Sequence, residues 1–176
     1  MTTNSSVNGT IDVEREALLT FLAQQREFLL TTLQGLDKER ATRRTTDSSL
    51  HLAGIVKHLN EVERSWIAFI QDGPVEVDYE DPETFEKHEN GFRLLEGETL
   101  EGILADYAET ARATEEYVRS LPDLEVSHPL PEAPWFEKGV SWTARDVLLH
   151  MLREISQHCG HADIVRESLD GQKTMG

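Results

Sequence analysis

Apolar residues recur every three or four positions along four long segments of this chain, which is the spacing of amphipathic α-helices. The alternating apolar–polar pattern of a half-buried strand does not occur. The sequence therefore predicts an all-α protein, with four helices packed as a four-helix bundle joined by long connections. The four segments run from about residue 13 to 34, from 49 or 50 to 70, from 100 to 119 and from 143 to 169.

Polar residues that cap helices support these boundaries. Thr99 is a plausible N-cap for the third segment, and Thr143 with Asp146 three residues later has the arrangement of a capping box at the start of the fourth. Gly35 and Gly171 follow the first and last segments, as C-terminal glycines do. The connections 71–98 and 121–139 are rich in proline, glycine and acidic residues, and only one helical turn near Pro82 is expected in them.

The fourth segment places ionisable side chains on its apolar stripe. At roughly 100° per residue, Glu154 and His158 fall at the centre of the stripe that runs from Val147 to Val165. An unpaired carboxylate is costly to bury, so Glu154 needs a partner. Side chains at positions i and i+4 project side by side from a helix and can share a metal ion.

The second segment repeats this feature. Its stripe, from Leu52 to Phe69, carries His58 one turn after Ile55. The simplest joint interpretation is a site formed by His58, Glu154 and His158 between two helices, with His161 close by. The alternative is a buried Glu–His hydrogen bond, with His58 packed independently of it.

Composition limits the classes of function. A chain of 176 residues predicts one domain over 11–176, and the Thr/Asn/Ser-rich residues 1–10 predict a disordered tail. The net charge of −16 argues against partners such as nucleic acid or an anionic membrane surface. No apolar run is long enough to span a membrane, and no signal peptide is recognisable. A single cysteine, Cys159, fits a reducing compartment, so we expect a cytoplasmic protein.

Two stretches of the sequence resemble a known family. They are LAGIVKHLNEVERSW at 52–66 and LLHMLREISQHCGHAD at 148–163. Together they resemble the DinB-like superfamily, and more narrowly its actinobacterial branch of mini-circle proteins. The resemblance covers nearly the whole chain and implies a four-helix bundle of the DinB-like type.

The resemblance also implies a site and a class of activity. Members hold one divalent metal ion by a histidine of the second helix and two ligands one turn apart on the last helix. These positions are occupied here by His58, Glu154 and His158. A glutamate at the middle position is similar to the pattern of mycothiol-dependent maleylpyruvate isomerase, whose additional C-terminal domain this chain lacks. Other members with assigned activities are mycothiol or bacillithiol S-transferases.

The functional hypothesis is thus a divalent-metal-dependent thiol S-transferase that activates a low-molecular-weight thiol, mycothiol by the resemblance, for attack on an electrophile. Zinc is the first choice of metal, with nickel, iron, cobalt and manganese as alternatives. His161 is the candidate general base, by proximity alone. A metal-dependent hydrolase and a non-catalytic metal- or small-molecule-binding stress protein are the other functions considered. The partners expected are the thiol and the electrophile, and a homodimer if the bundle exposes an apolar seam.

Overall fold

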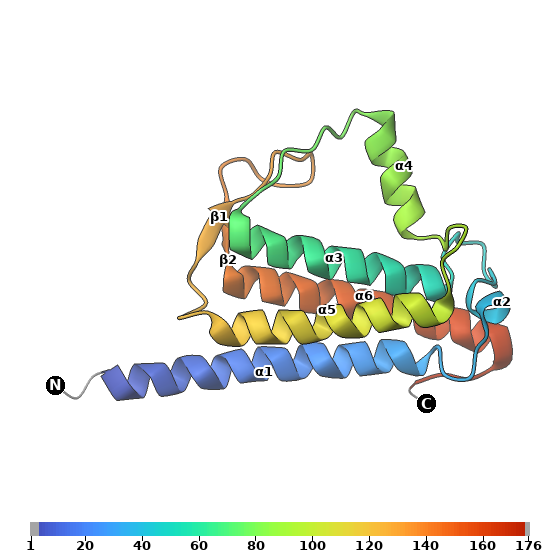
Figure 1. Ribbon diagram of the computed structural model, residues 1–176, viewed down its shortest axis with the longest axis horizontal. Helices are drawn as coiled ribbons and strands as arrows, with labels where there is room; N and C mark the ends of the chain where they lie inside the picture. Colours follow the sequence, from blue (N-terminus) through green and yellow to red (C-terminus); the bar gives the residue numbers. More distant parts are fainter. Residues whose placement is uncertain (1–3, 175–176) are drawn as a thin grey trace.

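The computed structural model describes the backbone of residues 4–174 and the side chains of residues 13–174. The chain is mostly helical over this range, as the hydrophobic pattern predicts. Four of its helices are long, and two short helices and a two-stranded sheet lie in the connections (Figure 1). The elements in chain order are α1 (Asn4–Thr31), α2 (Lys38–Ala41), α3 (Leu52–Asp72), α4 (Pro82–Gly91), α5 (Leu100–Ser120), β1 (Ser127–Pro129), β2 (Ser141–Thr143) and α6 (Ala144–Asp170).

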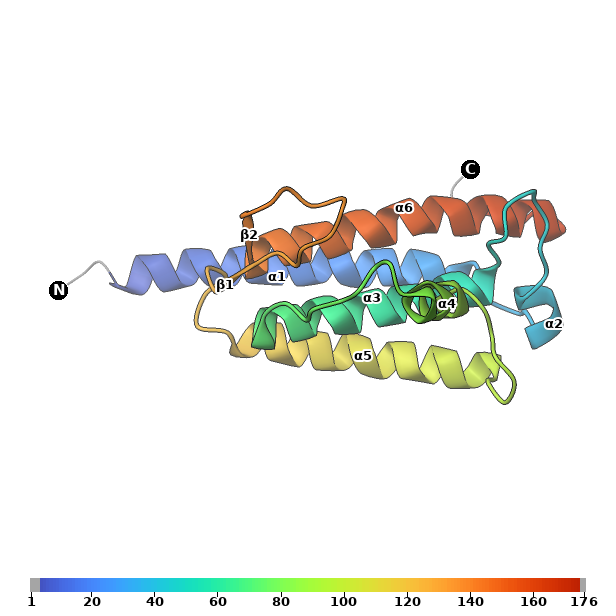
Figure 2. The ribbon, with the colours of Figure 1, turned by 90° about the horizontal axis from the view of Figure 1, so that it is seen from above.

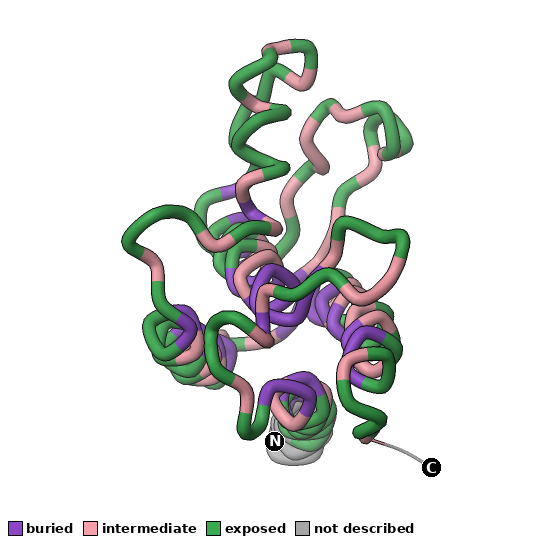
Figure 3. The backbone as a smooth tube through the Cα atoms, turned by 90° about the vertical axis from the view of Figure 1, so that its right-hand side faces the viewer, coloured by how far each residue is buried: buried purple, intermediate pink, exposed green. Residues whose placement is uncertain are grey.

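The four long helices lie side by side (Figures 1 and 2). α1 contacts α5 and α6, and α3 contacts the same two helices, so the four form a closed ring. Viewed along the helices, the buried positions of all four face the space that they enclose (Figure 3). Buried apolar side chains fill that space, among them Leu22, Ile55, Tyr107 and Met151.

Local signals predicted the helix ends well where a side chain caps the helix. The hydroxyl of Thr99 accepts a hydrogen bond from the Gly102 amide at the start of α5. Thr143 and Asp146 form the expected capping box of α6. α6 ends at Gly171, whose φ of 80° is the left-handed conformation that glycine adopts most easily.

The connections contain more regular structure than the sequence predicts. β1 pairs antiparallel with β2, with His128 opposite Trp142, although no strand was expected. Three-residue strands are too short to show an alternating pattern, and their pairing depends on a partner 14 positions away. α2 was not expected either, and α4 is longer than the single turn predicted near Pro82, with Asp81 as its N-cap.

The beginning of the chain also differs from the expectation. α1 begins at Asn4 rather than near Val13, so it extends across residues 4–10, for which a disordered tail was predicted. Residues 1–3 of that predicted tail lie outside the described part of the chain. None of the helices between residues 4 and 174 has the length and apolar character needed to cross a bilayer.

α4 and the β-sheet occupy one side of the ring of long helices. α4 stands on the side of α3 that faces away from α1, and the sheet with its connecting loop lies over the other end of α3 and α6 (Figures 1 and 2). Residues of both connections can therefore meet the groove between α3 and α6.

Candidate metal centre

His58, Glu154 and His158 come together in the groove between α3 and α6. One ligand atom from each lies within 4.8 Å of the other two, so the three side chains could hold a metal ion. Two donors at bond lengths of about 2.0–2.2 Å lie at most about 4.4 Å apart on one ion. Small side-chain adjustments therefore suffice for all three to reach a shared ion.

The three side chains are half-buried, which corrects the expectation that Glu154 and His158 lie at the centre of a buried stripe. The core-facing positions of α6 are Met151, Ile155 and Ala162. Glu154 and His158 lie on the edge of that face, where α6 meets α3. The edge position leaves both partly exposed, and Glu154 lines a cavity together with His58, as a site that receives a substrate must.

On α3, too, the buried face differs from the apolar stripe that the sequence predicts. Its deepest positions include Leu59, Asn60 and Glu63. Val62 and Trp66, which fall on the apolar stripe between Leu52 and Phe69, are only half-buried and line the cavity next to His58. The ridge from His58 to Trp66 thus faces the groove, and a buried ion pair occupies the core position instead: Arg26 Nη2 lies 2.7 Å from Glu63 Oε1.

The electrostatics of the site favour neutral imidazoles. Burial, followed by the nearby rings of His158 and His88, lowers the pKa of His58 to about 3. Burial, together with the ring of His161, also lowers the pKa of His158, although the Glu154 carboxylate opposes this. Because only the neutral imidazole offers a lone pair to a metal, both histidines are in the ligating form at neutral pH.

The donor set suits a catalytic ion. Two imidazole nitrogens and one carboxylate are ligands that zinc and its divalent neighbours accept, and three protein ligands leave a coordination position for a substrate. The residues present therefore fit the metal that the sequence predicts.

His161 lies on the helical turn after His158. Its Nδ1 is 3.5 Å from Nδ1 of His158, and the two ring centroids are 5.2 Å apart. It is half-buried. His161 thus borders the three-residue cluster and contacts one of its members, as the helical spacing predicts.

Two aromatic residues near the site could not be assigned from the sequence. The ring of Phe92, at the C-terminus of α4, stacks on His58 with centroids 3.9 Å apart. His88, one turn earlier on α4, lies edge-on to His58 at 6.2 Å. Neither has a periodic signal, because the connection that carries them is polar and its path over α3 is set by tertiary packing.

His150 also contacts the site. Its ring contacts the indoles of both Trp66 and Trp142, with ring centroids 4.8 and 5.0 Å away. Its Nε2 is 4.0 Å from Oε1 of Glu154, and its Nδ1 accepts a hydrogen bond from Arg153. Burial lowers the pKa of His150. His150 thus packs against two indoles and also lies next to a proposed metal ligand.

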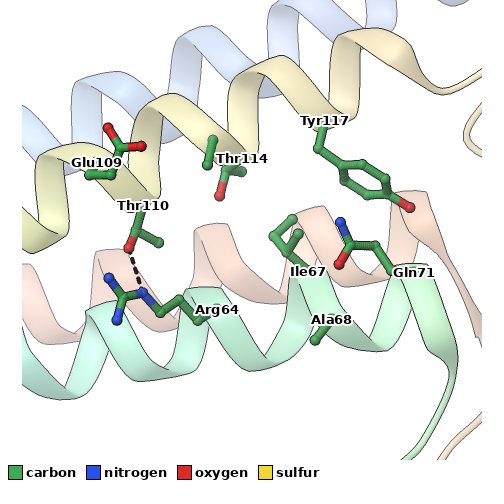
Figure 4. A pocket seen from close by; sticks show the side chains of 9 residues that line it. Arg64, Ile67, Ala68, Gln71, Glu109, Thr110, Thr114 and Tyr117 are labelled. Carbon is green, nitrogen blue, oxygen red and sulfur yellow. Dashed lines mark hydrogen bonds between the residues drawn. The ribbon is translucent and has the colours of Figure 1, made fainter.

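A separate groove lies between α3 and α5 (Figure 4). It has a volume of about 270 Å³, and Arg64 crosses it to donate a hydrogen bond to Thr110. Among the described residues that line this groove, none belongs to the His58–Glu154–His158 cluster. We therefore place the candidate function in the groove between α3 and α6.

Comparison with known protein families identifies one that this chain matches. A family model described as mycothiol-S-transferase matches residues 17–171, which is most of the chain and contains every residue of the cluster. A comparison with curated proteins finds no match.

Proposed function

The chain belongs to the mycothiol-S-transferase family, and from this premise we propose that it is a metal-dependent enzyme that transfers mycothiol to an electrophile. The observation that carries the proposal is the cluster of His58, Glu154 and His158 in one groove. We propose these three residues as ligands of one divalent ion, zinc by preference. The same family assignment leads us to propose that residues 11–176 form one DinB-like four-helix bundle.

The ion supplies one piece of chemistry when bound: it lowers the pKa of a thiol at its open position, so that a thiolate is available near neutral pH. The thiol has to come from the substrate. Burial raises the pKa of Cys159, the single cysteine, to about 11, and its Sγ donates to the Gln25 carbonyl. Cys159 is therefore a poor nucleophile.

His161 is the proposed acceptor of the thiol proton. Its ring lies next to His158, with the two Nδ1 atoms 3.5 Å apart, so it is close to the proposed metal ligands. Full transfer activity and an unchanged pH–rate profile in His161→Ala would remove it from the mechanism.

Elemental analysis of untagged protein tests the ligand assignment. We expect near-stoichiometric metal in the native chain and its loss in His58→Ala, Glu154→Ala and His158→Ala. His128→Ala is the matched control, because this histidine contacts the Ile70 carbonyl and lies outside the cluster. No metal in the native chain after reconstitution with divalent ions would overturn the proposal.

A transfer assay tests the reaction itself. The metal-loaded enzyme should consume mycothiol and an electrophile such as monobromobimane in equal amounts, and the three ligand variants should fall to the uncatalysed rate. Stoichiometric metal without thiol consumption would instead favour a binding protein, and ester hydrolysis without thiol would favour the hydrolase.

A further inference from the structure

All three tryptophans of the chain line one cavity beside the candidate metal centre. Trp66 is in α3, Trp135 is in the loop between β1 and β2, and Trp142 is in β2. The three side chains line a space of about 480 Å³. His58 and Glu154 belong to the same lining. The cavity therefore opens directly onto two of the proposed metal ligands.

The aromatic rings form a continuous wall. Trp66 stacks on Trp142 with centroids 5.1 Å apart and planes inclined by 26°. Phe136 meets both indoles edge-on, at 6.3 and 5.6 Å. A second cavity of about 370 Å³ shares Trp66, Trp135 and Phe136, so the wall has an open side on each face.

Trp135 is the exposed member of this wall. Trp135 is 64% exposed, and its ring contacts Tyr79 edge-on at 4.8 Å and Phe136 at 6.2 Å. Its indole lies at the cavity and does not pack in the core, so a flat surface of the ring is accessible to a ligand. Binding a flat apolar molecule there would remove this surface from water.

The polar groups of the cavity lie at one side. Arg153 is the one permanent cation among its described lining residues, and it donates to Nδ1 of His150 and lies 3.6 Å from Oε1 of Glu154. Its side chain is 67% exposed, so further guanidinium N–H donors can reach a ligand. They suit the oxygens of a nitro or carboxylate group.

We infer that this cavity binds a flat, electron-poor aromatic ring, and that such a ring is the electrophile of the reaction. The inference rests on the proposed transfer of a thiol. Indole faces carry negative partial charge, so they stack best on rings whose electrons are withdrawn. The same withdrawal makes a ring susceptible to attack by a thiolate, so affinity and reactivity select the same substrate.

The reaction balances for a halonitrobenzene. The thiol sulfur forms a bond to the ring carbon that carries the halogen, and the carbon–halogen bond breaks. The halide leaves with the bonding electron pair, and the thiol proton passes to His161 and then to solvent. The products are an aryl thioether and the hydrogen halide, and no oxidant or reductant is needed.

Tryptophan fluorescence measures binding in this cavity without turnover, because every tryptophan of the chain lines it. We expect saturable quenching by 2,4-dinitrotoluene, which lacks a leaving group, beyond its effect on free tryptophan amide. In Trp135→Ala the dissociation constant should rise by about three- to tenfold, the loss of one aromatic contact. Phe21→Ala removes an exposed aromatic ring from α1 and should leave it unchanged. Unsaturable quenching, or equal affinity in both variants, would overturn the inference.

Turnover separates the inference from the proposed function. With 1-chloro-2,4-dinitrobenzene and mycothiol, Trp135→Ala should raise KM by a similar factor and leave kcat nearly unchanged. With iodoacetamide, which has no ring, Trp135→Ala should change KM less than it does with 1-chloro-2,4-dinitrobenzene, and Phe21→Ala should match the native enzyme with both electrophiles. Saturable aromatic binding without any thiol transfer would overturn the proposed function and support the cavity assignment. Transfer to both electrophiles with no effect of Trp135→Ala would support the function and overturn the inference.

Discussion

The ring of Phe92 lies nearly parallel to the imidazole of His58, with centroids 3.9 Å apart and planes inclined by 19°. Phe92 is the C-cap residue of α4, and His58 is in the first half of α3. The stacking therefore joins the long connection over α3 to a proposed metal ligand. It also restricts the rotation of the His58 ring.

Phe92→Ala should weaken metal binding without removing a ligand. A freed imidazole must be ordered when the ion binds, and the loss of such supporting contacts costs about tenfold or more in metal affinity. Competition with a chromogenic chelator would measure the change. Phe85→Ala is the control, because Phe85 is on the same helix and 64% exposed, and its affinity should equal that of the native chain. Equal affinity in the Phe92 variant would show that the stacking does not support the site.

Gly54→Ala should destabilise the protein, because a Cβ at this position would lie 2.0 Å from the carbonyl oxygen of Phe92. The backbone of residue 92 would have to move away from α3, and the Phe92 ring with it. Thermal unfolding and metal affinity should both decrease. Gly160→Ala makes the same substitution within α6 where no atom lies within 4 Å, and should stabilise the protein by about 0.5–1 kcal/mol through helix propensity. Equal effects in the two variants would contradict the close approach of residue 92 to α3.

Glu63→Gln should cost about 3–5 kcal/mol in the free energy of unfolding. Glu63 is 1% exposed and accepts two hydrogen bonds from Arg26, which is 5% exposed. The substitution leaves a buried guanidinium with the more distant Glu115, at 3.6 Å. Urea unfolding would measure the loss, and the double variant Arg26→Met with Glu63→Leu should recover most of it. Glu109→Gln, in a surface pair with Arg112, should change nothing measurable. A small loss in Glu63→Gln would contradict the buried pair.

His51 should make the stability of the protein fall in mild acid. Its Nδ1 accepts the Gly54 amide at the N-cap of α3, and burial lowers its pKa below the usual value of 6.5. Because the unfolded chain binds the proton more readily, this contribution is complete above pH 6.5 and is lost as the pH falls toward the pKa of the folded state. His51→Asn keeps a capping oxygen without titrating. The difference in unfolding free energy between native and variant metal-free proteins should therefore shrink or change sign from pH 8 to pH 5. A constant difference would exclude His51 as a cause.

The sequence alone determined the helical class and most helix ends, because the 3.6-residue period and the capping residues act within one or two turns. It also selected His58, Glu154 and His158, since helical spacing shows which side chains share a face. Their proximity is found in the structure, and their role as metal ligands stays a prediction.

Tertiary structure decided the surroundings of these residues. The apolar stripe of α6 could not show that Glu154 lies at the edge of the core rather than at its centre. The position of the neighbouring helices decides which part of the stripe is buried, and the periodicity of one helix does not contain that information. Phe92 reaches His58 from a polar connection, and Trp66 meets Trp142 from 76 positions away. Such contacts depend on the path of loops and on packing between distant segments, and local periodicity contains neither.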